Sequence, residues 1–526
     1  METEKPRTWT RRDAIKALCL SASALAFSPK RSLGGVAENA TKKPNIVLIL
    51  SDDVGYGDLG CYGATGVHTP NIDRLSKQGL RFTDAHSDAA TCTPSRYAIM
   101  TGEYAWRNEG AHILPGDAAL LIDPAKPTLP STLKKAGYST GCVGKWHLGL
   151  GNGNIDWNGD IRPGPCEVGF DYSFIIPATA DRVPCIYVEN HRVVGLDPKD
   201  PIVVSYTQNI GTDPTGHDHP ELLKMALSEG HSHAPSEHAG TIVDGVSRIG
   251  FMSGGKSARW VDEMMAPTLV RKANIFIEQH KDEPFFLYFA TSDIHVPRVP
   301  NNQFVNTSAC GIRCDAIEQL DWSVGQVMAM LDRLGLTDNT LVIFSSDNGP
   351  VVDDGYADGS VEHLNGHQPA GQFRGGKYSI YEGGTRMPFI AHWPGHIQPG
   401  ESAALLGQID LLASLGSLAG TPTQARVVPD STDQLPALLG KSKTGREFLV
   451  EESSVLAIRK GQWKLVDAKE VVGKRRASSG DTGGTEFQLY DLFKDPGESN
   501  NVADANPDIV LELSTKLKSI RGRVRS

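Results

Sequence analysis

The sequence has no run of eighteen apolar residues, so no segment predicts a transmembrane helix. It also has no C-x-x-C pair, no Cys/His spacing typical of a zinc site, no internal repeat and no nucleic-acid-binding motif. Basic residues are fewer than acidic ones: the chain has 52 Lys and Arg and 62 Asp and Glu, which gives a formal net charge of −10. Such a chain repels nucleic acid and sulfated polymers, so an anionic substrate would need a local cationic pocket.

The composition is otherwise ordinary. The chain has 526 residues, of which 39% are hydrophobic and 22% charged. These values are typical of a globular protein, and the length favours one large and one smaller domain.

The N-terminus predicts an export signal over residues 1–26. Arg11 and Arg12 lie in a stretch that resembles a twin-arginine motif, an apolar segment follows, and Ala24-Leu25-Ala26 is a cleavage candidate. A basic disordered tail is the alternative interpretation. Residues 27–43 predict a polar linker. We therefore expect export machinery as a partner and the bacterial periplasm as the location.

Eight cysteines are present. Cys19 lies in the predicted leader and Cys92 in a motif described below, and the other six allow fifteen pairings, among which the sequence does not choose. Cys166–Cys185 and Cys310–Cys314 are the short-loop candidates, and free buried thiols are equally compatible with the pattern.

Continuous apolar runs predict strands buried on both faces at 45–50, 284–290 and 340–344. The first run ends in Asp52 and Asp53, and open α/β sheets bind ligands at the carboxyl ends of their strands. A polar strand exit without function is the alternative. A strand at 389–393 is expected to close the sheet.

Helices are predicted at 70–78 with Thr69 as the cap, from Pro94 onward, and at 128–136, 260–279, 313–334 and 411–418. Short antiparallel strands at 456–466 and 487–492, with a helix at 509–521, indicate a small C-terminal unit. The segment 150–255 is rich in Gly, Pro, Asp and His and predicts loops over the site edge. Five of its histidines cluster within 217–238, and a polar loop is favoured there over a second metal site: His217, His219, His231, His233 and His238.

Three stretches form a recognisable set of motifs. Cys92-Thr93-Pro94-Ser95-Arg96 is followed by Thr101-Gly102, residues 137–149 read GYSTGCVGKWHLG, and residues 375–388 read GGKYSIYEGGTRMP. With Asp52-Asp53, His295-Val296-Pro297 and Asp347-Asn348, they resemble the motifs of the sulfatase family in the family's order. Glu103 departs from the Arg that many members carry, which puts surface or subsite contacts in doubt.

The resemblance implies an alkaline-phosphatase-like α/β fold. A large mixed sheet sandwiched by helices would occupy residues 44–420, and a small antiparallel sheet with a helix would occupy residues 421–526. It also implies that a formylglycine-generating or maturase enzyme converts Cys92 to formylglycine (3-oxoalanine), whose hydrate is the nucleophile.

The resemblance further implies one metal site and a set of catalytic residues. The ligands would be Asp52, Asp53, Asp347, Asn348 and the modified residue 92. Hard oxygen donors suit Ca²⁺ or Mg²⁺, and the family favours Ca²⁺. Arg96 would orient the nucleophile, and Lys145 and Lys377 would hold sulfate. His295 would protonate the leaving oxygen, and His147 would then break down a covalent sulfate hemiacetal.

The expected reaction is hydrolysis of a sulfate ester on a carbohydrate, with exo action on galactose or N-acetylgalactosamine 6-O-sulfate as the substrate hypothesis. A formylglycine-dependent phosphodiesterase or phosphonate hydrolase is one alternative. A sulfated-glycan binder without activity, in which Cys92 stays unmodified, is the other.

Overall fold

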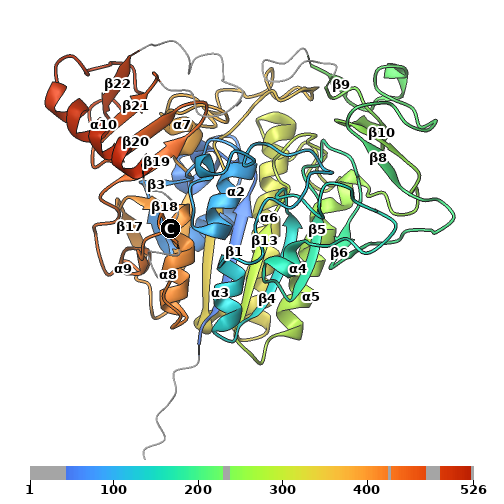
Figure 1. Ribbon diagram of the computed structural model, residues 1–526, viewed down its shortest axis with the longest axis horizontal. Helices are drawn as coiled ribbons and strands as arrows, with labels where there is room; N and C mark the ends of the chain where they lie inside the picture. The colour runs from blue at the N-terminus through green and yellow to red at the C-terminus, as the bar shows by residue number, and fades with distance from the viewer. Residues whose placement is uncertain (1–42, 229–236, 424–427, 470–485, 523–526) are drawn as a thin grey trace, which may run out of the picture. The chain divides into compact units, whose positions relative to one another are not determined.

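A ten-stranded mixed sheet organises the chain in the computed structural model (Figure 1). The structure describes residues 43–228, 237–423, 428–469 and 486–522. The predicted leader and nearly all of the predicted linker lie outside these residues. Within them, no helix combines the length and the apolar character needed to cross a bilayer.

The five central strands of the sheet are parallel, and antiparallel neighbours continue it on both sides. From one edge to the other the order is β17 (Gly400–Ser402), β2 (Leu80–Phe82), β16 (Phe389–His392), β14 (Thr340–Ser346), β1 (Asn45–Ser51), β13 (Phe285–Ala290), β4 (Ser139–Lys145), β5 (Tyr172–Ile176), β6 (Val188–Glu189) and β7 (Arg192–Val193).

Helices cover both faces of this sheet, which is why every residue of β1 and β13 is buried. Figure 1 shows two layers, and helices within each layer pack together. One layer holds α1 (Pro70–Gln78), α5 (Met265–Gln279) and α6 (Gly311–Arg333), and the other holds α2 (Cys92–Thr101), α3 (Leu129–Lys135) and α8 (Leu411–Leu418).

The C-terminal part forms a separate four-stranded antiparallel sheet against which one helix packs. Its elements are β19 (Leu449–Glu452), β20 (Leu456–Lys460), β21 (Trp463–Asp467), β22 (Phe487–Asp491) and α10 (Pro507–Arg521). The predicted fold class is therefore confirmed. The predicted domain boundary at residue 420 stays a prediction.

Short elements complete the described chain. They are α4 (Pro165–Val168), α7 (Glu382–Thr385), α9 (Leu435–Leu438) and the strand pairs β3 (Ala85–His86) with β18 (Leu406–Gly407), β8 (Val203–Ser205) with β12 (Phe251–Ser253), β9 (Ala226–Leu227) with β15 (Tyr356–Ala357), and β10 (Ile242–Val243) with β11 (Val246–Ser247).

Two expectations about the large sheet were wrong. The segment 150–255 is not loops alone, because β5 pairs in parallel with β4 and extends the sheet. The strand at 389–393 does not close the sheet, because β2 and β17 lie beyond β16. Both errors have one cause: strands of two to five residues among Gly, Pro and Asp lack a long apolar signal.

Two helix starts also differ from prediction. The helix predicted from residue 260 begins at Met265, after a 3-10 turn at Asp262–Met264. The Thr69 hydroxyl does not cap α1. Instead, the Asp321 carboxylate of α6 accepts the backbone N–H groups of Asn71 and Ile72 at 3.0 and 2.8 Å. A distant side chain therefore satisfies the helix start, which local sequence does not reveal.

The small sheet supports the start of α2. The Ala90 N–H donates to the Glu452 carbonyl at 2.9 Å, two residues before Cys92, and the Glu452 N–H donates to the Asp88 carbonyl at 3.1 Å. The Ser453 hydroxyl also donates to the Tyr378 carbonyl at 2.5 Å. The end of β19 thereby fixes the backbone on which Cys92 and Lys377 depend.

A buried ion network joins the two sheets around Glu382. Its carboxylate contacts Arg459 and Lys464, each at 3.0 Å, and Arg386 at 3.1 Å. Burial alone would raise the pKa of Glu382, but the three cations bring it down to about 2. Because the folded-state pKa lies below the ordinary 4.5, the ionised carboxylate stabilises the fold above pH 4.5, and that contribution is lost as the pH falls toward 2.

We expect Glu382→Gln to lower the free energy of unfolding at pH 7 by about 3 kcal/mol, because it leaves buried cations without their partner. The variant should also lose less stability than the wild type between pH 4.5 and 2. Denaturant unfolding at several pH values checks both. Glu401→Gln is the control, because Glu401 pairs with Arg81 at the surface and should cost less than about 1 kcal/mol. Equal losses of unfolding free energy in the two variants would contradict a stabilising role for the buried network.

Candidate active site

The carboxyl ends of four neighbouring strands bring the predicted residues together. Asp52 and Asp53 follow β1, Asp347 and Asn348 follow β14, His295 lies beyond β13, and Lys145 ends β4 with His147 two residues later. Cys92 is the first residue of α2. Parallel strands end at the same sheet edge, so residues almost 300 positions apart in the chain meet there.

In Asp52, Asp53 and Asp347, one carboxylate oxygen contacts a cationic side chain. Lys145 Nζ lies 2.6 Å from Asp52 Oδ2 and Lys377 Nζ lies 2.9 Å from Asp53 Oδ2. Arg96 contacts Asp347 Oδ2 through Nε at 2.9 Å and Nη2 at 2.8 Å. The side chains in these pairs are essentially inaccessible to solvent, so the cations offset much of the cost of burying the carboxylates.

The remaining oxygens of the cluster fit a divalent cation. Among the described residues, Asp52 Oδ1 and Asn348 Oδ1 are buried without a hydrogen-bond partner, a costly state unless something else binds them. The Asn348 amide donates to Asp53 Oδ1 at 2.7 Å, which turns its own oxygen away from Asp53. Burial raises the pKa of Asp52 well above its usual value, and the neighbouring Asp347 and Asp53 charges add to the effect despite Lys145. A hard cation would relieve this repulsion.

His147 is positioned as a base beside residue 92. Its Nε2 lies 2.9 Å from the Leu114 carbonyl, so Nε2 carries the proton and Nδ1 keeps its lone pair. That Nδ1 lies 3.3 Å from Cys92 Sγ. Burial, with help from Lys145 and Arg182, holds the pKa of His147 well below its usual range. The imidazole is therefore neutral and able to accept a proton from a group on residue 92.

The His147 backbone has φ of +52° and that of Asp53 +60°. Both lie in the left-handed region that a residue with a side chain rarely adopts. Such strain is commonly found where side-chain placement matters for function.

His295 and Lys377 form a second proton-handling pair. Lys377 Nζ lies 3.1 Å from His295 Nε2, while His295 Nδ1 lies 2.7 Å from the Val296 carbonyl. Burial and then Lys377 lower the pKa of His295 to about 4. The opposite holds for Lys377: burial would lower its pKa, but Asp354 and Asp53 raise it well above the usual value. The proton of this pair therefore resides on Lys377 in the absence of an anion.

Sequence reasoning missed three contributors to this site. Asp354 accepts from Lys377 Nζ at 3.0 Å, Tyr288 OH accepts from Arg96 Nη1 at 3.3 Å, and the Leu114 carbonyl fixes the His147 tautomer. Asp354 follows Asn348 by six residues in an Asp-Asp-Gly turn, a weak signal. The carbonyl of Leu114 carries no sequence signal.

The remaining predicted residues lie elsewhere or have other partners. His217 and His219 are exposed and contact Asp218 and Glu221, and His238 is buried beside Asp181. His231 and His233 lie outside the described residues. Glu103 is buried and accepts a hydrogen bond from Tyr97, so it is not a surface residue, and an effect on subsite contacts stays a prediction.

One of the two short-loop cysteine pairings forms, between Cys310 and Cys314. Cys166 and Cys185 are free thiols.

A buried nucleophile candidate, cations and two histidines at the ends of parallel strands define a hydrolase of anionic esters. Comparison with known proteins narrows this class. A family model described as Sulfatase matches residues 44–421. The chain therefore belongs to the sulfatase family and is a sulfuric ester hydrolase.

Individual relatives agree. N-acetylgalactosamine-6-O-sulfatase from Bacteroides thetaiotaomicron is 52% identical over 487 residues, covering 92% of this chain and 94% of the relative. Human arylsulfatase A is 34% identical over 498 residues, covering 90% of this chain and 86% of its own. A solved structure from work on the metabolism of multiple glycosaminoglycans by Bacteroides thetaiotaomicron has a TM-score of 0.87 at 52% identity, and it covers 92% of this chain and 100% of that chain.

Removing divalent metal should destabilise the protein, because Asp52, Asp53 and Asp347 then repel one another. We expect a divalent cation at one hundred times its dissociation constant to add about 2.7 kcal/mol to the free energy of unfolding of the chelated protein, measured as a rise in the unfolding midpoint. Asp52→Asn should reduce that rise. Asp358→Asn should not, because the Asp358 side chain is also little exposed but pairs with Arg298 outside the cluster. An unfolding midpoint that stays the same with chelator and with added Ca²⁺ or Mg²⁺ would contradict a metal site.

Proposed function

We propose that the protein removes 6-O-sulfate from terminal galactose or N-acetylgalactosamine residues of sulfated carbohydrates. The observation that carries the substrate is the 52% identity to an N-acetylgalactosamine-6-O-sulfatase across almost the full length of both chains. The similarity covers 92% of this chain and therefore continues beyond the catalytic motifs. Arylsulfatase A, at 34% identity, is a weaker guide to the substrate.

The nucleophile is proposed to be formylglycine made from Cys92 by a formylglycine-generating or maturase enzyme. Burial raises the pKa of the Cys92 thiol even though Lys145 and Lys377 oppose the effect. An unmodified Cys92 would therefore remain a neutral thiol and a weak nucleophile. The hydrated aldehyde instead supplies two hydroxyl groups on one carbon, one to attack sulfur and one to release sulfate.

The metal is proposed to be Ca²⁺, held by Asp52, Asp53, Asp347, Asn348 and the modified residue 92. When bound, it supplies positive charge that favours an ionised hydroxyl and offsets charge on the sulfuryl oxygens. The donor set contains only oxygen atoms, which suits Ca²⁺ and, less well, Mg²⁺.

The chain's own side chains divide the remaining work of the first step. Arg96, fixed by Asp347, orients the nucleophile at residue 92. Lys145 and Lys377 offer ammonium groups to the sulfuryl oxygens. The Lys377–His295 pair supplies the proton to the leaving sugar oxygen, because Lys377 already donates toward His295 Nε2.

His147 acts in the second step. Its unprotonated Nδ1 lies next to the side chain of residue 92, and Lys145 and burial keep it neutral. It takes the proton from the second hydroxyl as sulfate departs, which regenerates the aldehyde. The two histidines therefore serve different steps, and their variants should fail differently.

Export to the bacterial periplasm, directed by residues 1–26, completes the proposal. It rests on the Arg11-Arg12 pair and the apolar segment after it.

Release of free sulfate from a panel of monosulfated sugars tests the substrate. We expect galactose or N-acetylgalactosamine 6-O-sulfate to be hydrolysed at least tenfold faster, in kcat/KM, than the 4-O-sulfate and 3-O-sulfate isomers. Matched 6-phosphates belong in the panel, because faster phosphate release would favour the phosphodiesterase or phosphonate hydrolase alternative. A protein that binds the sulfated sugars and releases nothing would support the glycan-binder alternative.

Leaving-group dependence tests the division between the histidines. His295→Gln should slow sugar sulfates by about a hundredfold or more, the usual range for general-acid catalysis, and slow 4-nitrophenyl sulfate much less, because nitrophenolate needs no proton. His147→Gln should slow both substrates alike, because both pass through the same second step. Steady-state rates on the two substrates give the comparison, with His217→Gln, an exposed histidine, as control. The reverse pattern would contradict the assigned roles.

A further inference from the structure

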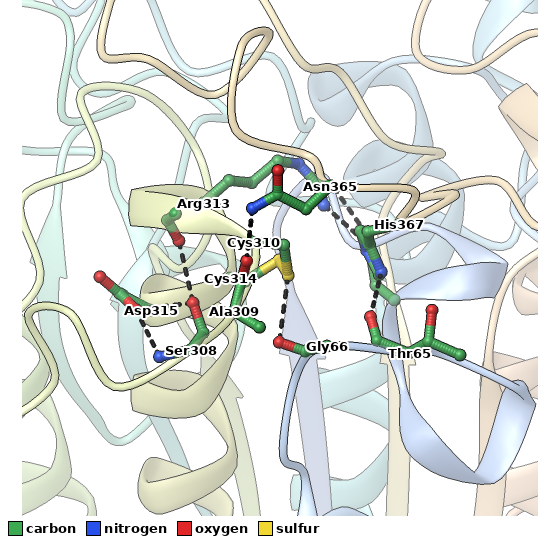
Figure 2. Close-up of a disulfide and its surroundings, with 12 residues drawn as sticks. Thr65, Gly66, Ser308, Ala309, Cys310, Arg313, Cys314, Asp315, Asn365 and His367 are labelled. Carbon is green, nitrogen blue, oxygen red and sulfur yellow. Dashed lines mark hydrogen bonds and ion pairs between the residues drawn. A yellow bond between two sulfur atoms is a disulfide. The ribbon is translucent and has the colours of Figure 1, made fainter.

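A second cluster of metal-ligating side chains lies at the start of α6, apart from the residues assigned to the reaction. Cys310 and Cys314 form a disulfide there, and His367 lies beside it (Figure 2). One ligand atom from each of these three residues lies within 4.8 Å of the other two. All three side chains are buried.

The disulfide explains little of this arrangement. It closes a loop between residues four apart, so it ties the first turn of α6 mainly to itself and restricts the unfolded chain little. Three segments distant in sequence nevertheless converge here. Cys310 Sγ lies 3.3 Å from the Gly66 carbonyl, and His367 Nδ1 lies 3.2 Å from the Thr65 carbonyl.

The partners of His367 prepare it as a ligand. Its Nε2 lies 2.7 Å from Asp58 Oδ1, and both terminal nitrogens of Arg313 donate to the same carboxylate at 2.6 and 2.7 Å. Asp58 is therefore ionised and accepts the Nε2 proton, so Nδ1 is the ring nitrogen that remains to bind a metal. A histidine whose other nitrogen donates to a carboxylate is the usual metal-binding arrangement.

An oxygen donor also lies at the edge of the cluster. The Thr65 carbonyl oxygen is 3.2 Å from His367 Nδ1. Gly66 and Ala309, which flank the cluster, are exposed, so an ion has a short path from solvent.

We propose that reduction of the Cys310–Cys314 disulfide creates a zinc site formed by the two thiolates and His367 Nδ1. A dithiol reductant transfers two electrons: the S–S bond breaks, each sulfur takes a proton, and the dithiol becomes a disulfide. Zn²⁺ then displaces the two thiol protons. Two sulfurs and one imidazole suit Zn²⁺ rather than Ca²⁺, and a backbone carbonyl or water completes four-coordination.

The two states differ in what they connect. The disulfide links positions within one helical turn, whereas the zinc ion would join α6 to the segment that contains His367. The same cluster thus provides a local bond under oxidising conditions and a longer-range connection under reducing conditions. The site is separate from the oxygen-ligated cluster and does not depend on the proposed sulfatase substrate.

Cobalt substitution tests the proposal on the full chain. The protein is reduced with dithiothreitol, desalted without oxygen and titrated with Co²⁺, with the oxidised protein in parallel. We expect the reduced protein to bind one Co²⁺ more than the oxidised protein, with sulfur-to-cobalt charge-transfer absorption and the intense visible bands of tetrahedral cobalt. Zn²⁺ should displace it. Any binding at the oxygen-ligated cluster is common to both samples and cancels in the difference.

Two variants identify the ligands. Cys314→Ser and His367→Asn should each abolish the difference spectrum, and near-ultraviolet circular dichroism verifies that each remains folded. Cys166→Ser is the matched control, because it removes a free thiol outside the cluster and should keep the spectrum. A reduced, folded wild-type protein without the cobalt bands would overturn the proposal, as would bands that survive in both ligand variants.

Discussion

The site depends on the pairing of buried carboxylates with buried cations at the ends of parallel strands. Asp52, Asp53 and Asp347 are fully buried at one sheet edge, where their mutual repulsion would be severe without Lys145, Lys377 and Arg96. Two of these cations, Lys145 and Lys377, are the groups proposed to meet the sulfuryl anion. Structure and proposed chemistry therefore share one set of charges, and each cation is held in place by a carboxylate before any substrate arrives.

That preorganisation extends into the small sheet. The Glu452 backbone holds the residues before Cys92, and the Ser453 hydroxyl holds Tyr378, the neighbour of Lys377. Glu382 belongs to the same motif as Lys377 and is bonded by Arg459 and Lys464 of the small sheet. The C-terminal unit thus contributes to the site, because it positions both the nucleophile candidate and Lys377, the proposed sulfate-binding cation.

The sequence predicted the parts of the fold that have a strong local signal. Long apolar runs located β1, β13 and β14, and the polar residues directly after them located most of the site. The sequence did not predict the contacts that tertiary structure determines. Three contacts depend on segments that meet only in the folded chain. Asp354 accepts a hydrogen bond from Lys377, Asp321 accepts from the first backbone N–H groups of α1, and the Leu114 carbonyl accepts from His147. The pairing of Cys310 with Cys314, one of two short-loop candidates, likewise had to come from the structure.

The central claim is that residue 92 acts as an aldehyde rather than a thiol. Mass spectrometry of the peptide that contains residue 92, from enzyme purified out of its own host and active on a sulfate ester, tests it most directly. The account predicts a peptide in which the thiol is replaced by an aldehyde, and which reacts with a hydrazide reagent. An unmodified Cys92 throughout a fully active preparation would contradict it.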